Sequence, residues 1–192
     1  MVPRDQQEKY VPQGRIEVIA GGMFSGKSEE LIRRVRREII AGRSVRVYKP
    51  KVDDRYATNA VVSHIKNEIP CTTVADTEEL CEDLRLNTAP VIAIDEAQFF
   101  GFDLAKIANR LANQGRRVII AGLDMDSEGL PFGPIPVLMA MAEDVEKLHA
   151  VCIQCGEDAS FSFHKGKKAG QVEVGADQYE ARCRACWSEG NE

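Results

Sequence analysis

The stretch that decides the fold is GGMFSGKSEE, which runs from Gly21 to Glu30. Gly21, four further residues and then Gly26-Lys27-Ser28 fit the P-loop pattern. In this pattern the glycines let backbone N–H groups face phosphate oxygens, the lysine reaches the β/γ-phosphates, and the serine hydroxyl binds Mg²⁺. We therefore expect a phosphate cradle made of Gly21, Gly22, Met23, Phe24, Ser25, Gly26, Lys27 and Ser28.

The residues on either side support this prediction, because a P-loop lies between a strand and a helix. IEVIA (16–20) is a short β-rich apolar run, and a helical pattern of apolar residues follows until Gly42. Strands and helices continue to alternate, which predicts an α/β fold with a P-loop NTPase-type parallel sheet flanked by helices. The further strands are expected at 45–49, 91–95 and 117–124, and the further helices at 77–86, 104–111 and 135–142.

Two acids end one of these strands in VIAIDEAQFF (91–100). P-loop enzymes use such an acid in the Mg²⁺ shell, so we assign Asp95 to magnesium together with Ser28. Neighbouring residues at a strand end can point differently, so Glu96 could instead take a proton from an attacking hydroxyl. The plainer alternative for Glu96 is a salt-bridged or solvent-facing acid.

Four of the six cysteines form two Cys-x-x-Cys pairs, Cys152 with Cys155 and Cys183 with Cys186. Two such turns can build a tetrahedral site of four thiolates, which suits Zn²⁺ and leaves no position open for substrate. The predicted zinc is therefore structural, and His149 and His164 are expected not to bind it. The alternative is four cysteines without a ligand.

The chain divides into three parts by sequence character. Residues 1–14 lack periodicity and are expected to form a mobile tail, and residues 15–143 form the P-loop domain. Residues 144–192 form a smaller zinc-binding unit, in which QVEV (171–174) is strand-like. Within the P-loop domain, residues 51–71 show no clean helix and are interpreted as a long, mobile loop or a hairpin.

The composition narrows the possible environments and partners. A net charge of −5 argues against a general nucleic-acid binder, and the basic run from Arg33 to Arg37 is interpreted as a solvated helix face. We expect no membrane span, because no apolar stretch approaches about 20 residues. The polar N-terminus lacks the apolar core of a signal peptide, so we expect a cytoplasmic protein.

Taken together, these motifs resemble the cytosolic-type (type II) thymidine kinase family. The resemblance extends from Gly14 to Trp187 and rests on GGMFSGKS, DDRY, IDEAQFF, GLDMDSEGLPFG, CIQC and VEVGADQYEARCRAC. It implies transfer of the γ-phosphate of ATP to the 5′-hydroxyl of thymidine, and of deoxyuridine, for DNA-precursor salvage. It also implies a lasso loop in the zinc-binding domain, a homotetramer, and feedback inhibition by dTTP, the end-product triphosphate.

The resemblance further assigns roles to individual residues. Glu96 would be the catalytic base, and Arg55, in DDRY, a phosphate or transition-state contact. Ser127 departs from the family, because relatives can carry an aromatic residue there, and Ser162 lies in an unusual segment, SFSFHK. The thymidine site would be formed by Met23, Phe99, Leu123, Phe132, Val172, Val174, Gly175 and Tyr179.

An inactive scaffold that binds only ATP is disfavoured by the intact Lys27, Ser28, Asp95 and Glu96. Two other readings stay open at this point. One is a kinase for a different nucleoside. The other is a P-loop ATPase whose zinc knuckle binds nucleic acid, against which the acidic charge balance and the lack of an interleaved basic and aromatic stripe both count.

Overall fold

The structure, a computed structural model, describes residues 13–51, 60–62, 68–166 and 176–191. Its centre is a six-stranded sheet in the order β5-β2-β6-β7-β1-β8, and each neighbouring pair of strands is parallel. The predicted parallel α/β sheet is therefore confirmed. The strands are β1 (Arg15–Gly21), β2 (Val45–Pro50), β5 (Thr72–Val74), β6 (Val91–Ile94), β7 (Arg117–Gly122) and β8 (Asp144–Leu148).

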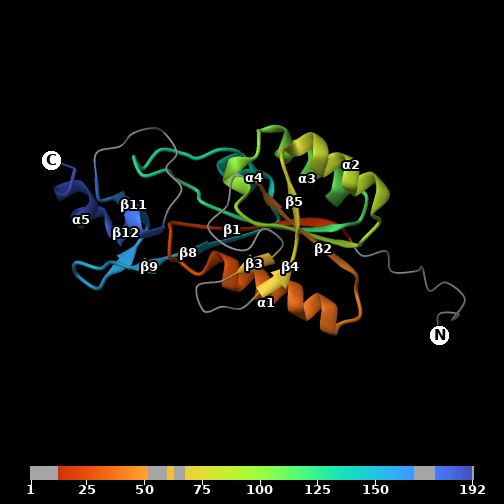
Figure 1. The fold of residues 1–192 in the computed structure, drawn as a ribbon, viewed down its shortest axis with the longest axis horizontal. Coiled ribbons are helices and arrows are strands. Elements are labelled where there is room, and N and C mark those ends of the chain that lie inside the picture. Colours follow the sequence, from red (N-terminus) through yellow and green to blue (C-terminus); the bar gives the residue numbers. More distant parts are fainter. Residues whose placement is uncertain (1–12, 52–59, 63–67, 167–175, 192) are drawn as a thin grey trace, which may run out of the picture.

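Helices cover both faces of this sheet (Figure 1). Helix α1 (Lys27–Ile40) lies on one face, and α2 (Thr77–Leu86), α3 (Asp103–Asn113) and α4 (Ile135–Met141) lie on the other. Val18 and Ile19, neighbours in β1, belong to two different core clusters, because successive strand residues point to opposite faces. Burial on both sides explains why the central strands are continuous apolar runs.

The predicted solvated face of α1 is wrong at Arg34, which is 8% exposed. Its guanidinium group makes ion pairs with Glu17 of β1, with Glu30 on its own helix, and with Asp144 and Glu146 of β8. Arg34 can therefore be buried although it belongs to the basic run, because four carboxylates on β1, α1 and β8 neutralise its charge.

Residues 51–71 contain the predicted hairpin. Strands β3 (Ala60–Val62) and β4 (Glu68–Pro70) pair in antiparallel fashion, and Ile69 packs into the cluster beneath α1. Residues 52–59 and 63–67 lie outside the described part of the chain, as do 1–12 of the predicted tail.

The remaining elements form a small C-terminal unit at the far end of β1 and β8 (Figure 1). It contains β9 (Ala150–Val151), β10 (Asp158–Ala159), β11 (Phe161–His164), β12 (Tyr179–Arg182) and helix α5 (Arg184–Glu189). The predicted division before residue 144 assigns β8 to this unit, whereas β8 pairs with β1 and so belongs to the main sheet. QVEV lies outside the described residues.

No helix in the described ranges has the length and apolar character needed to cross a membrane.

Candidate active site

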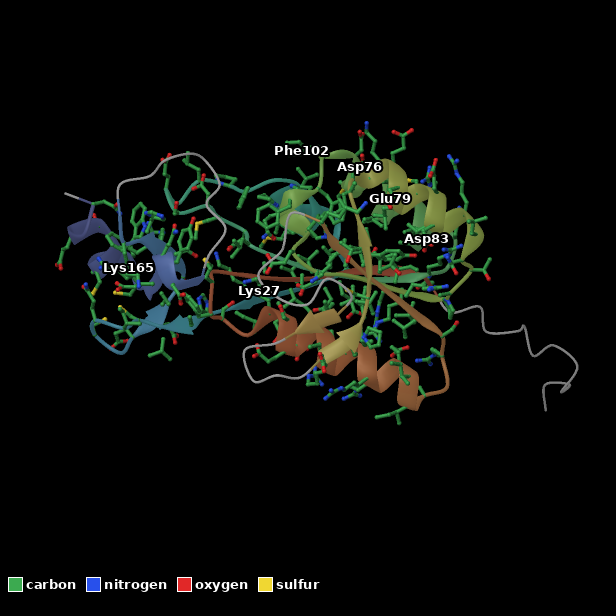
Figure 2. All side chains as sticks on the ribbon, viewed as in Figure 1. Lys27, Asp76, Glu79, Asp83, Phe102 and Lys165 are labelled. Carbon is green, nitrogen blue, oxygen red and sulfur yellow. The ribbon has the colours of Figure 1, made fainter. Side chains whose placement is uncertain are left out.

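The phosphate loop follows β1 directly and returns the chain to α1. Gly21 has a φ of 147°, and a Cβ atom there would lie 2.3 Å from the carbonyl oxygen of Leu148, so no larger residue fits. Ser25 Oγ and Lys27 Nζ both donate hydrogen bonds to the carbonyl oxygen of Gly22, each at 2.8 Å. Lys27 therefore lies folded over the loop at the start of α1 (Figure 2).

The N-terminus of α1 suits a bound anion. Gly26, the N-cap residue, has a φ of 87° and no side chain that could cap the helix. The first N–H groups of a helix point outward and carry the positive end of the helix dipole. The loop, Lys27 and this helix end thus have the geometry that a phosphate cradle needs, and their binding of phosphate stays a prediction.

Asp95 and Ser28 are brought together as the sequence predicts. Ser28 Oγ donates to Asp95 Oδ2 at 3.0 Å, and Asp95 is only 5% exposed. Burial and the neighbouring charge of Glu96 raise the pKa of Asp95 to about 7, although the hydrogen bond from Ser28 opposes this. A carboxylate beside a hydroxyl offers the hard oxygen ligands that Mg²⁺ prefers, and a bound cation would restore the ionised form. The two residues therefore fit a magnesium ion.

Glu96 starts a short 3-10 helix (Ala97–Phe99) and lies in the left-handed backbone region at φ 50° and ψ 39°. Few residues other than glycine adopt this conformation. Gln98 Nε2 donates to Glu96 Oε2 at 2.5 Å, so the carboxylate is held by a neighbour. The structure thus gives the predicted catalytic acid a defined orientation near Asp95.

Several residues assigned to the nucleoside site lie around the same end of the sheet. The rings of Phe99 and Phe132 meet edge to face, with centroids 5.9 Å apart. Leu123 is half-buried, and its N–H donates to Gln98 Oε1 at 3.0 Å. Met23 is buried in the phosphate loop.

Ser162, whose role the sequence leaves open, joins the C-terminal unit to the phosphate loop. Its Oγ accepts a hydrogen bond from the Met23 N–H at 3.0 Å, and the serine is 4% exposed. Sequence reasoning could not place this contact, because the two residues are 139 positions apart. The alternation of polar and apolar residues in SFSFHK is a local signal for a strand that the sequence analysis did not use, and β11 lies there.

Asp124 is a second residue that the sequence analysis missed. It is buried, and its Oδ2 pairs with Lys147 of β8 at 2.7 Å. Among the described residues its Oδ1 has no hydrogen-bond partner. The sequence does contain a signal for Asp124, because the apolar run RVIIAGLD (117–124) ends in an acid just as VIAID (91–95) does.

Phe24 and Tyr179 share a hollow between the phosphate loop and the C-terminal unit. The hollow has a volume of about 400 Å³, and its other walls are formed by β9, β12 and Ile153. Within the pair of strands β11 and β12, the ring of Tyr179 packs edge to face against the ring of His164, with centroids 5.0 Å apart. Arg55, Val172, Val174 and Gly175 lie outside the described residues, so their predicted roles stay predictions.

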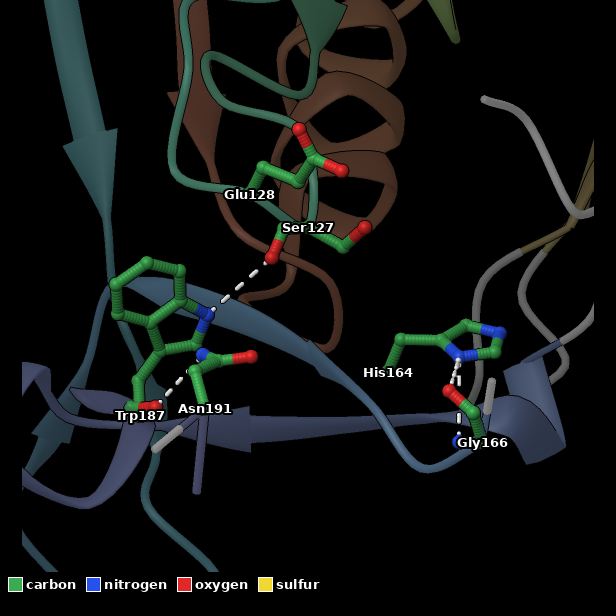
Figure 3. Close-up of a pocket in the computed structure, with 6 residues that line it drawn as sticks. All are labelled: Ser127, Glu128, His164, Gly166, Trp187 and Asn191. Carbon is green, nitrogen blue, oxygen red and sulfur yellow. Dashed lines mark hydrogen bonds between the residues drawn. The ribbon is translucent and has the colours of Figure 1, made fainter. Parts of the chain in front are cut away.

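A second pocket, of about 460 Å³, lies between the loop after β7 and the C-terminal unit (Figure 3). On one side Trp187 Nε1 donates to the carbonyl oxygen of Ser127 at 3.3 Å, and the Trp187 ring stacks on Phe161. On the other side, Nδ1 of His164 lies within hydrogen-bonding distance of the Gly166 backbone. Ser127, which the sequence analysis singled out, thus lines this pocket.

The four predicted zinc ligands form one cluster. All their sulfur atoms lie within 4.8 Å of one another, and Cys155 Sγ is 3.6 Å from Cys183 Sγ. A tetrahedron with Zn–S bonds of about 2.3 Å has S···S edges of about 3.8 Å, so the cluster fits a zinc ion. His149 instead contacts Ser160 Oγ through Nδ1 at 3.0 Å, and neither histidine belongs to the cluster.

The pKa values within the cluster diverge. A backbone hydrogen bond from Cys183 lowers the pKa of Cys152 to about 6. The side-chain hydrogen bond with Cys183 raises the pKa of Cys186 to about 12. Four thiolates this close repel one another, so a divalent cation is needed for all of them to ionise together.

Comparison with known proteins agrees with this geometry. The family model for thymidine kinase matches residues 14–187. The chain belongs to the thymidine kinase family. A thymidine kinase from Bacteroides fragilis is 50% identical over 91% of this chain and 87% of the relative. One from Bdellovibrio bacteriovorus is 53% identical over 90% of this chain and 84% of the relative.

A solved structure outside this family shares the fold. The flagellar accessory protein FlaH from Methanocaldococcus jannaschii superposes with a TM-score of 0.53 at 14% identity, covering 77% of this chain and 76% of FlaH. At that identity the likeness concerns the arrangement of the elements alone. It supports the arrangement of the parallel sheet and its flanking helices.

Proposed function

We propose that this member of the thymidine kinase family transfers the γ-phosphate of ATP to the 5′-hydroxyl of thymidine, giving ADP and dTMP. The observation that carries the proposal is the meeting of the phosphate loop, Asp95 and Glu96 at one end of the sheet. Relatives about 50% identical over most of the chain are thymidine kinases, which supports the same substrate.

The chemistry follows from the positions of these groups. Glu96 accepts the proton of the 5′-hydroxyl while that oxygen attacks the γ-phosphorus, and the bond to the ADP oxygen breaks. Lys27 and the loop N–H groups stabilise the charge that develops on the phosphates. Ser28 and Asp95 would hold Mg²⁺, which when bound neutralises phosphate charge.

The nucleoside would lie against Met23, Phe99, Leu123 and Phe132, with Tyr179 on the side of the C-terminal unit. Val172, Val174 and Gly175 would supply lasso backbone near the base, and Arg55 would contact phosphate, as the family resemblance implies. Support among the described residues comes from the Phe99–Phe132 pair and from the contact of Ser162 with Met23.

The remaining features of the proposal concern the whole protein. The cysteine cluster would hold one structural Zn²⁺, and the chain would work as a cytoplasmic homotetramer in DNA-precursor salvage, inhibited by dTTP, without binding nucleic acid or membrane. Its parts would be a tail (1–14), an ATP-binding kinase domain that includes β8, and a zinc-binding lasso domain after Leu148.

A panel of nucleosides with ATP tests the substrate. Thymine presents a donor at N3 and an acceptor at O4, whereas cytosine reverses both. Backbone groups of the lasso cannot exchange these roles, so deoxycytidine should be rejected by about 10⁴-fold in kcat/KM. Deoxyuridine lacks only the methyl group and should lose at most roughly 10–200-fold. Purine nucleosides should not react.

Two results would contradict the proposal. Equal kcat/KM for thymidine and deoxycytidine would point to a kinase for another nucleoside. ATP hydrolysis that single- or double-stranded DNA stimulates, without nucleoside phosphorylation, would point to the nucleic-acid-binding ATPase.

A further inference from the structure

We propose that Gln98 is the positioning residue of the catalytic base, holding the Glu96 carboxylate and tying it to the wall of the nucleoside site at Leu123. The inference rests on the proposed function, because it takes Glu96 as the base. It starts from two hydrogen bonds of one side chain. Nε2 of Gln98 donates to Glu96 Oε2 at 2.5 Å, and Oε1 accepts from the Leu123 N–H at 3.0 Å.

The direction of the Gln98 amide is fixed by its partners. A backbone N–H can only donate, so the amide oxygen must face Leu123. The amide nitrogen must then face Glu96, and its N–H groups suit a carboxylate, which accepts only. A side chain rotated by half a turn would lose both hydrogen bonds.

The surroundings hold Gln98 in place. Its side chain is 2% exposed, so the amide is shielded from competing water. Two glycines leave room for it: a Cβ atom at Gly122 would lie 2.8 Å from Gln98 Oε1, and one at Gly133 would lie 2.2 Å from the Gln98 carbonyl oxygen. Because this space is filled, the rotamer of Gln98 is set before any substrate arrives.

This arrangement explains what Gln98 can contribute to the rate. A base that is already oriented adds no ordering cost when the hydroxyl binds, and a misplacement of about 1 Å can cost about 10²-fold. Leu123 belongs to the predicted wall of the nucleoside site. If Leu123 shifts, Gln98 and the Glu96 carboxylate shift with it through the two hydrogen bonds. The distance between Glu96 and the 5′-hydroxyl is thereby maintained.

The test uses Gln98→Met, which keeps the length of the side chain and removes both hydrogen bonds. We expect kcat for thymidine to fall about 10- to 100-fold, with the KM values for thymidine and ATP changed by less than about threefold. Gln98→Glu keeps an acceptor for the Leu123 N–H and replaces the donor with a carboxyl group, so kcat should fall at least as far. Gln114→Met, at an exposed glutamine after α3, is the matched control and should keep the wild-type kcat.

A double variant separates positioning from a general structural role. If Gln98 acts through Glu96, adding Gln98→Met to Glu96→Gln should lower kcat by less than about twofold further. Losses that multiply in the double variant would overturn the inference, as would a wild-type kcat in Gln98→Met. If Gln98→Met does not fold, judged by thermal melting, Gln98→Glu with and without Glu96→Gln decides by the same criterion.

The same experiment distinguishes this inference from the function beneath it. A wild-type chain that does not phosphorylate thymidine would contradict the proposed function. A chain that does so, loses kcat in Glu96→Gln and keeps it in Gln98→Met would contradict the inference about Gln98 alone.

Discussion

Glu96 shows how a single residue can be placed for chemistry at a cost to the fold. Its left-handed backbone, at φ 50°, costs of order 1 kcal/mol for a residue with a side chain. In return, the chain turns sharply after β6. The backbone N–H of Glu96 then donates a hydrogen bond to Asp95 Oδ1 at 3.0 Å. Under the proposed mechanism, this strained turn lets the two adjacent acids take two different tasks.

Glu96→Gln should lower kcat by about 10²- to 10⁴-fold, because general base catalysis is typically worth that much. The substitution keeps the shape of the side chain and leaves the phosphate loop untouched, so the Kd for ATP should not change. Steady-state kinetics and ATP titration measure the two quantities. Glu82→Gln, at an exposed acid on α2, is the control. A Glu96→Gln variant with nearly normal kcat would remove Glu96 from the mechanism.

The site residues that the sequence could predict are those that lie within a short local motif. Lys27, Ser28, Asp95 and Glu96 follow from spacing relative to a strand end, because the chemistry of phosphate and metal fixes that spacing. Gln98 lies in the same stretch, but its role depends on Leu123, which comes from another strand. Tertiary contacts of this kind have no local sequence signal.

At the scale of the elements, β1, β7, β8 and α1 are joined by a group of buried charges around Glu17. This carboxylate is 1% exposed and makes ion pairs with Arg15, Arg34 and Arg117. A buried acid without such partners would be strongly destabilising. The group therefore ties α1 to the sheet at the end opposite the phosphate loop, where no substrate is expected.

Glu17 predicts how stability depends on pH. Burial alone would raise its pKa, but hydrogen bonds from Arg117 and Arg34 outweigh burial and lower the pKa below the ordinary 4.5. An acid whose pKa is lowered on folding contributes stability above its unfolded pKa and loses that contribution as pH falls through the folded value. The free energy of unfolding should therefore decrease below about pH 4.5.

Comparison of the wild type with Glu17→Gln isolates this effect, because thiolates of the cysteine cluster also become protonated in acid. At pH 7 the variant should be less stable by about 3 kcal/mol, the lower end for a broken buried pair, since the arginines keep other acids nearby. The difference should shrink between pH 5 and pH 3, measured by urea unfolding. A difference that is constant with pH would contradict the assignment.

Within the main sheet, the strands that the sequence missed lie at the two edges. The central strands were predicted because burial on both faces makes them apolar throughout. In contrast, β5 spans only Thr72–Val74, and β8 reads DVEKL with two acids that pair with Arg34. Short or charged edge strands look like loops in a sequence, because their pairing with a neighbour is what defines them.

For the molecule as a whole, two hydrogen bonds between described residues link the C-terminal unit to the catalytic end of the sheet. Ser162 accepts a hydrogen bond from the phosphate loop, and Trp187 donates one to the loop after β7. Gly129, at φ 74°, allows that loop to approach Phe161 and Trp187. The shape of this unit therefore bears on both the phosphate loop and the wall of the nucleoside site.

Beyond the stacked rings of Phe161 and Trp187, the C-terminal unit has little buried apolar material with which to keep that shape. Its core cluster is Ala150, Cys152, Ala159 and Ala181, with Cys183 and Cys186 packed against it. Alanine and cysteine side chains bury too little area to fold so small a unit alone, and units of this kind depend on a structural metal. The zinc ion is thus expected to supply most of the stability of β9 to α5.

Removal of one ligand tests this dependence. Elemental analysis should find about one zinc ion per chain in the wild type and much less in Cys183→Ser, since three thiolates bind less tightly than four. The KM for thymidine should rise about 10-fold or more, because the nucleoside is expected to contact this unit itself. The KM for ATP should rise less, because the phosphate loop is held between β1 and α1 of the main domain, although the hydrogen bond of Met23 to Ser162 also joins it to β11. Cys81→Ser, outside the cluster, is the control and should keep zinc and both KM values. Metal-free protein with full activity would contradict the structural role of the cluster.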